Sequence, residues 1–137
     1  MLYLLRVRLP MNVQFPLFLL EKDCGELCKF DSIAEMQYKL ERIDVENEEY
    51  EAWDSNGLEV ALSVREPEWL NLTVRPDGSG VDELRTAVIR YARAVGIAID
   101  DSLPLESIGA TIERIGNEQE PQTLERSPIR RFFKRLK

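Results

Sequence analysis

The dipeptide Asn56-Gly57, which lies between two segments of alternating polarity, constrains the fold of this chain more than any other feature. After it, every second residue is hydrophobic and would share one face of a strand: Leu58, Val60, Leu62 and Val64. The same alternation returns at Leu70, Leu72 and Val74. Asn-Gly favours a tight type I′ turn between antiparallel strands. We therefore predict three antiparallel strands, over about residues 49–54, 58–65 and 69–75, with one buried face.

A second hairpin is predicted closer to the N-terminus. Residues 13–22 are dense in large apolar side chains, which is typical of a strand buried on both faces. Asp23-Cys24-Gly25 has the composition of a turn. Residues 26–30 are expected to return antiparallel to the first strand.

Helices are predicted from caps and from hydrophobic periodicity. Ser32 and Glu35 have the spacing of a capping box, so a helix should begin there and fade near Ile43. A second helix should follow residues 76–80 and end near Gly96, and a third should follow Pro104 and end at Gly116. The resulting order β-β-α-β-β-β-α-α predicts an α+β fold, an antiparallel sheet of about five strands with two or three helices packed beside it.

The length of 137 residues suits a single domain. We assign this domain to residues 13–116. Residues 1–12 would be an extra strand or an upstream extension, because Met11 is a second candidate for the native start after Met1. Residues 117–127 are polar and predict a linker, and residues 128–137 form a basic amphipathic tail.

Charge is distributed very unevenly along the chain. Residues 126–137 hold six basic side chains and no acidic one, so the remainder carries −13, which is the net charge of −7 less the +6 of this segment. An acidic body repels phosphates and anionic surfaces, and it attracts cations and basic proteins. We therefore expect a basic protein partner, and we do not expect nucleic acid to bind the body.

Residue types exclude several classes of chemistry. The chain has no histidine, so neither a Ser-His-Asp nor a Cys-His catalytic arrangement can form within it. Two cysteines without histidine cannot build a Cys₂His₂ or Cys₄ zinc site. A calcium loop beginning at Asp44 would need glycine and glutamate where the chain has Glu49 and Ser55. We predict no cofactor, no metal and no enzymatic activity, with a small carboxylate-dependent enzyme as an alternative because 25 acidic residues offer many carboxylate pairs.

The compartment is predicted from the cysteines and from the N-terminal segment. Cys24 and Cys28 are expected to be free thiols in a reducing environment, since small exported domains usually carry more cysteine. The apolar residues 1–20 are interrupted by arginine, proline, asparagine and glutamine, which argues against a membrane span or a signal peptide. A cytoplasmic location is expected.

An acidic run is the first candidate for a binding surface. Its carboxylates would meet a basic partner and its two aromatic residues would serve as anchors. A solvated connection that keeps the protein soluble is the alternative interpretation. The candidate partner-binding residues are Glu46, Glu48, Glu49, Tyr50, Glu51, Trp53 and Asp54.

The C-terminal tail is the second candidate. Hydrophobic residues recur at the spacing of one helix face, at Ile129, Phe132, Phe133 and Leu136. Basic residues fill the positions between them, at Arg130, Arg131, Lys134 and Arg135. Such a helix could bind an anionic membrane or a groove in a partner. It could equally return to its own acidic domain or remain a solvated end.

These observations favour a non-enzymatic acidic protein-interaction domain, an immunity-like or inhibitor-like protein or an adaptor, that binds a basic partner. The first alternative is a peripheral membrane or scaffold protein anchored by its basic amphipathic C-terminal helix. The second is the small carboxylate-dependent enzyme. The sequence carries no signal of oligomeric state.

Overall fold

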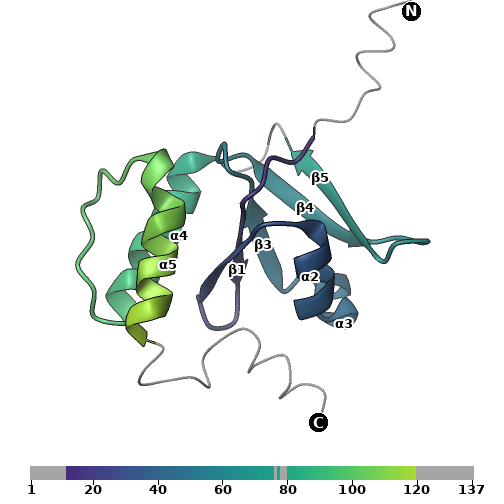
Figure 1. Ribbon diagram of the computed structural model, residues 1–137, viewed down its shortest axis with the longest axis horizontal. Coiled ribbons are helices and arrows are strands. Elements are labelled where there is room, and N and C mark those ends of the chain that lie inside the picture. The colour runs from purple at the N-terminus through teal and green to yellow at the C-terminus, as the bar shows by residue number, and fades with distance from the viewer. Residues whose placement is uncertain (1–11, 76, 78–79, 120–137) are drawn as a thin grey trace, which may run out of the picture.

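The computed structural model describes residues 12–75, 77 and 80–119, and its centre is a five-stranded antiparallel sheet (Figure 1). The strand order is β2-β1-β3-β4-β5. The predicted α+β class and the predicted order of elements are confirmed. The strands are β1 (Leu17–Glu21), β2 (Leu27–Phe30), β3 (Tyr50–Trp53), β4 (Glu59–Val64) and β5 (Leu70–Arg75).

Helices cover both faces of this sheet (Figure 1). On one face, α4 (Val81–Ala94) and α5 (Ile108–Gln119), the latter preceded by the 3-10 turn η1 (Leu105–Ser107), bury Phe18 and Trp53. On the other face, α2 (Ile33–Lys39) and α3 (Arg42–Glu46) bury Leu17, Leu19 and the inward side chains of β4 and β5. Strand β1 is therefore buried on both sides, as its apolar run predicts.

The β3–β4 hairpin forms at the predicted position with a different turn. The amide of Asp54 donates to the carbonyl of Leu58 at 2.9 Å, and the amide of Gly57 donates to the carbonyl of Asp54 at 2.9 Å. Three residues therefore form the loop, and Gly57 alone among them has a positive φ, of 83°. The predicted type I′ turn is wrong, because that turn needs a positive φ at Asn56 as well.

Helix α2 begins at the predicted cap. The amide of Glu35 donates to the hydroxyl of Ser32 at 3.1 Å. The Glu35 carboxylate accepts from the amide of Asp31 at 2.8 Å, one residue before the expected donor. Partial burial raises the pKa of Glu35, but the Asp31 amide and the Lys39 ammonium together outweigh it, so this pKa lies below its ordinary value.

Two helix ends differ from the prediction. Helix α2 ends at Lys39 instead of fading near Ile43, because Leu40 turns to an extended conformation, and the short helix α3 follows. Helix α5 continues past Gly116 to Gln119. Its last turns are held by the fully buried Ile115 and by an ion pair of 2.8 Å between Arg114 and Glu118. The first three residues of the predicted linker are therefore helical.

An ion pair joins the sheet edge to α5. The Lys29 ammonium on β2 lies 2.6 Å from the Glu113 carboxylate, and this hydrogen bond raises the pKa of Lys29 above its ordinary value.

None of the helices in the described part of the chain is long and apolar enough to cross a membrane.

Candidate functional site

Two turns meet at one end of the molecule, the lower end in Figure 1. Because β1 and β3 are antiparallel neighbours, the end of β1 lies beside the start of β3, with Glu21 opposite Tyr50 and Leu20 opposite Glu51. The amide of Lys22 donates to the carbonyl of Glu49 at 3.0 Å. This pairing fixes the β1–β2 turn against the α3–β3 turn.

Acidic side chains are concentrated on these two turns. Residues 21–26 and 44–51 contain eight carboxylates and one cation, Lys22. Glu21 and Asp44 are buried, 9% and 2% exposed. The other six carboxylates form what we call the acidic end, and they are Asp23, Glu26, Glu46, Glu48, Glu49 and Glu51. Within the described part of the chain, no ion pair involves Glu46, Glu48 or Glu51. The charges of these three carboxylates are therefore not compensated by an ion pair among the described residues.

Of the two aromatic anchors expected in this run, Trp53 is buried and Tyr50 is partly exposed. Trp53 is 1% exposed and packs in the core beneath α4 and α5. Tyr50 is half-buried, and its hydroxyl donates to the Asp44 carboxylate at 3.3 Å. Neither Trp53 nor the equally buried Asp54 can face a partner, so these two residues do not belong to the surface.

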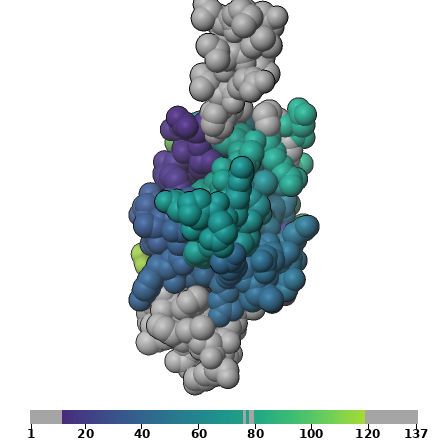
Figure 2. Space-filling model, turned by 90° about the vertical axis from the view of Figure 1, so that its right-hand side faces the viewer, coloured from purple at the N-terminus to yellow at the C-terminus, as the bar shows by residue number. Residues whose placement is uncertain are grey.

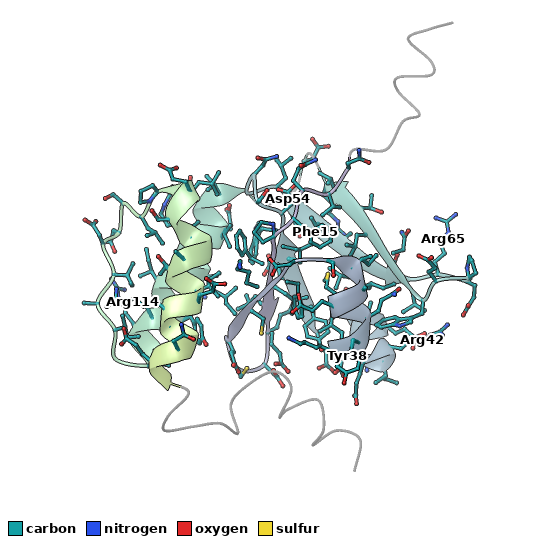
Figure 3. The ribbon with its side chains drawn as sticks, in the orientation of Figure 1. Phe15, Tyr38, Arg42, Asp54, Arg65 and Arg114 are labelled. Carbon is teal, nitrogen blue, oxygen red and sulfur yellow. The ribbon has the colours of Figure 1, made fainter. Side chains whose placement is uncertain are left out.

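Two other hydrophobic side chains are exposed near the acidic end. Tyr38 on α2 is 71% exposed, and Ile43 on α3 is 58% exposed. Figure 3 shows Tyr38 close to Arg42 at the foot of the two helices. Figure 2 shows the face where these helices, in blue, adjoin the β4–β5 hairpin, in teal. The sequence analysis singled out neither residue as a candidate, and it expected Ile43 at the fading end of a single helix and not in a separate one.

A hollow of about 250 Å³ opens at the acidic end between β3 and β4. The ladder between these two strands is short, with two residue pairs, Ala52 with Val60 and Trp53 with Glu59. The apolar lining of the hollow includes Val45, Val60 and Leu62, and its charged lining is Lys22, Glu48, Glu51, Glu59 and Arg75. Arg75 and Glu59 are 3.9 Å apart. Such a site can hold a side chain with an aliphatic stem and a cationic head.

Glu48 has an unfavourable backbone conformation. Its φ is 56°, and it is the one non-glycine residue with a positive φ in the described ranges. It follows the end of α3, a position where glycine is preferred because it carries no Cβ. The acidic end therefore keeps a glutamate where the backbone alone would favour glycine.

Asp54 stabilises the β3–β4 hairpin at the opposite end of the sheet (Figure 3). Its Oδ1 accepts from the amides of Asn56 and Leu58 at 2.9 and 3.0 Å. Its buried Oδ2 has no hydrogen-bond partner among the described residues. The hairpin thus depends on one oxygen of this carboxylate.

Asp54→Ala is expected to destabilise the domain by about 1–3 kcal/mol, because two partly buried hydrogen bonds to the amides of Asn56 and Leu58 lose their acceptor. Asp54→Asn can keep Oδ1 as the acceptor and removes a buried charge, so it should cost less than half as much. Urea denaturation of both variants measures the difference. Equal losses would show that the two Oδ1 hydrogen bonds are not the stabilising feature.

One group of side chains has donor atoms close enough for a metal ion. The carboxylates of Glu21 and Asp23 and the thiol of Cys24 offer donor atoms within 4.8 Å of one another. Cys24 Sγ lies 3.9 Å from Glu21 Oε1, at the long limit of a thiol hydrogen bond. Cys24 and Cys28 form no disulfide in the described part of the chain.

The predicted tail residues, from Ile129 to Leu136, lie outside the described residues.

No known family model matches the chain, and comparison with curated proteins and with solved structures finds no match. The function must therefore be argued from the site alone.

Proposed function

We propose that this protein is a non-enzymatic acidic interaction domain that binds a basic protein partner through its acidic end, as an immunity-like or inhibitor-like protein or an adaptor. The observation that carries the proposal is the concentration of eight carboxylates beside one cation on two adjoining turns. Three of these carboxylates, on Glu46, Glu48 and Glu51, make no ion pair with a described residue.

Electrostatics and shape both support this proposal. A localised negative field steers a positively charged surface into encounter and raises its association rate. The hollow between β3 and β4 offers a partner an apolar contact in addition to the electrostatic attraction. Its apolar lining suits the aliphatic stem of a lysine or arginine. Tyr38 on α2 and Ile43 on α3 add exposed apolar area to the same molecule.

We place this function in the cytoplasm, as part of the same proposal. The absence of a disulfide at Cys24 and Cys28, within the described residues, supports a reducing compartment. The alternative function, anchoring to a membrane or scaffold through residues 128–137, depends on a segment outside the described residues.

Capture from a lysate of the source organism with three immobilised full-length proteins tests the proposal. These are the unchanged chain, a variant carrying Glu46→Lys, Glu48→Lys and Glu51→Lys, and a control carrying Glu68→Lys, Asp77→Lys and Glu106→Lys. The control residues are exposed and make no ion pair with a described residue, and both variants change the net charge equally. We expect a basic protein to be retained by the unchanged chain and by the control alone. Equal retention by all three, or retention by none, contradicts the proposal.

Glu48→Gly is expected to stabilise the fold and to weaken partner binding. Relief of the left-handed conformation is worth about 1–2 kcal/mol, and the greater freedom of glycine in the unfolded chain returns about half of it, which leaves a net gain of about 0.5–1 kcal/mol. Glu46→Gly is the matched control, since Glu46 lies within α3 and glycine there should destabilise. The denaturation midpoints of the two variants measure their stabilities. A destabilised Glu48→Gly would show that the glutamate side chain supports the fold itself.

A further inference from the structure

The described chain ends at the acidic end of the molecule. Helix α5 runs down to Gln119, and in Figure 1 its last turn lies at the same end as the β1–β2 turn and α3. The chain after Gln119 has 18 residues, and its last twelve hold all of the +6 charge described above. The most basic segment of the sequence is thus tethered next to the most acidic surface.

The tether is long enough for contact within one molecule. Residues 120–125 can span up to about 20 Å and residues 120–130 about 35 Å, at 3.3–3.6 Å per residue. A domain of this size has a radius of gyration of about 13 Å, so every carboxylate of the acidic end is within reach. A short tether gives an effective concentration in the millimolar range, which favours even a weak contact between opposite charges.

We propose that residues 126–137 bind the acidic end of their own molecule, so that a basic partner must displace them. The opposite charges of the two segments and the position at which α5 ends support this contact. The tail then acts as a built-in competitor. It lowers the apparent affinity of the acidic end for weakly basic proteins. A partner can displace the tail if it carries more positive charge than the tail, or if it also places a side chain in the hollow between β3 and β4.

Carbodiimide cross-linking of the full-length chain tests this contact, because the reagent joins a lysine amine to a carboxylate that touches it. An equal mixture of unlabelled and ¹⁵N-labelled protein separates links within one molecule from links between two. We expect Lys134 and Lys137 to be linked to carboxylates of the acidic end, within single molecules, and the yield to fall at least about threefold near 1 M salt. Links mainly between molecules, or mainly to Glu66, Glu68 and Glu106, would overturn the proposal.

A charge-neutral variant gives an independent readout. In the full chain with Glu46→Gln, Glu48→Gln and Glu51→Gln, the links from the tail to the unchanged Asp23, Glu26 and Glu49 should fall. The control with Glu68→Gln, Asp77→Asn and Glu106→Gln should keep them. An unchanged yield in the first variant would contradict the proposal. Capture of a basic partner by the acidic end without any tail link would also overturn it, and would leave the proposed function intact.

Discussion

Gly57→Ala is expected to destabilise the domain by about 2–4 kcal/mol, a large part of the 5–15 kcal/mol that holds a typical domain together. Two effects combine at this residue. Its φ of 83° is unfavourable for any residue with a Cβ. A Cβ would also lie 3.0 Å from the Cβ of Val81 and 3.3 Å from its Cα, so the start of α4 would have to shift. Urea denaturation gives the change in the free energy of unfolding.

Gly25→Ala is the matched control for this prediction. Gly25 has nearly the same φ, 79°, but a Cβ there would meet nothing within 4 Å. It should therefore report the conformational cost alone, about 1 kcal/mol. If both variants lost the same stability, the contact between Gly57 and Val81 would contribute nothing, and the packing of α4 against the β3–β4 turn would need another explanation.

The regular elements could be predicted because their signals are local. Alternation at Leu58 to Val64 and at Leu70 to Val74 gave strands correct to one residue at each end. The Ser32 hydroxyl marks the start of α2, and Gly96, with a φ of 83°, follows the end of α4. Each of these signals depends on neighbouring residues, which a sequence displays directly.

The candidate site could be predicted only in part, because β3 crosses the molecule. A strand rises about 3.3 Å per residue, so the five residues from Tyr50 to Asp54 reach from the acidic end to the opposite end of the sheet. The carboxylates from Glu46 to Glu51 lie at the acidic end. Trp53, in contrast, is paired with Phe18 in the core, and Asp54 stabilises the hairpin at the opposite end. A run that is continuous in sequence is thus divided in space.

The hollow had no signal in the sequence. Its walls combine Lys22 from one turn, Glu48 from another and Arg75 from the last strand. Only the sheet order and the short ladder between β3 and β4 bring these residues together. The division of the predicted helix into α2 and α3 likewise depends on tertiary contacts. In α3, Val45 is buried in the same cluster as Val60 of β4, a contact between segments far apart in the sequence.

Reversing three charges at the acidic end is expected to slow partner binding. With Glu46→Lys, Glu48→Lys and Glu51→Lys, the association rate constant for the captured basic partner should fall by about 10–100-fold at low salt, because the net charge of residues 21–26 and 44–51 falls from −7 to −1. Stopped-flow mixing with that partner measures the rate. The control with Glu68→Lys, Asp77→Lys and Glu106→Lys should change it far less, although its net charge is the same.

The dependence of this association rate on ionic strength tests the acidic end most directly. For the unchanged chain and the control, the rate constant should fall steeply as salt rises and shortens the Debye length from about 30 Å to about 8 Å. For the acidic-end variant, the dependence should be nearly flat. The same steep dependence in all three proteins would contradict the account, since the charge that steers the partner would then lie elsewhere on the molecule.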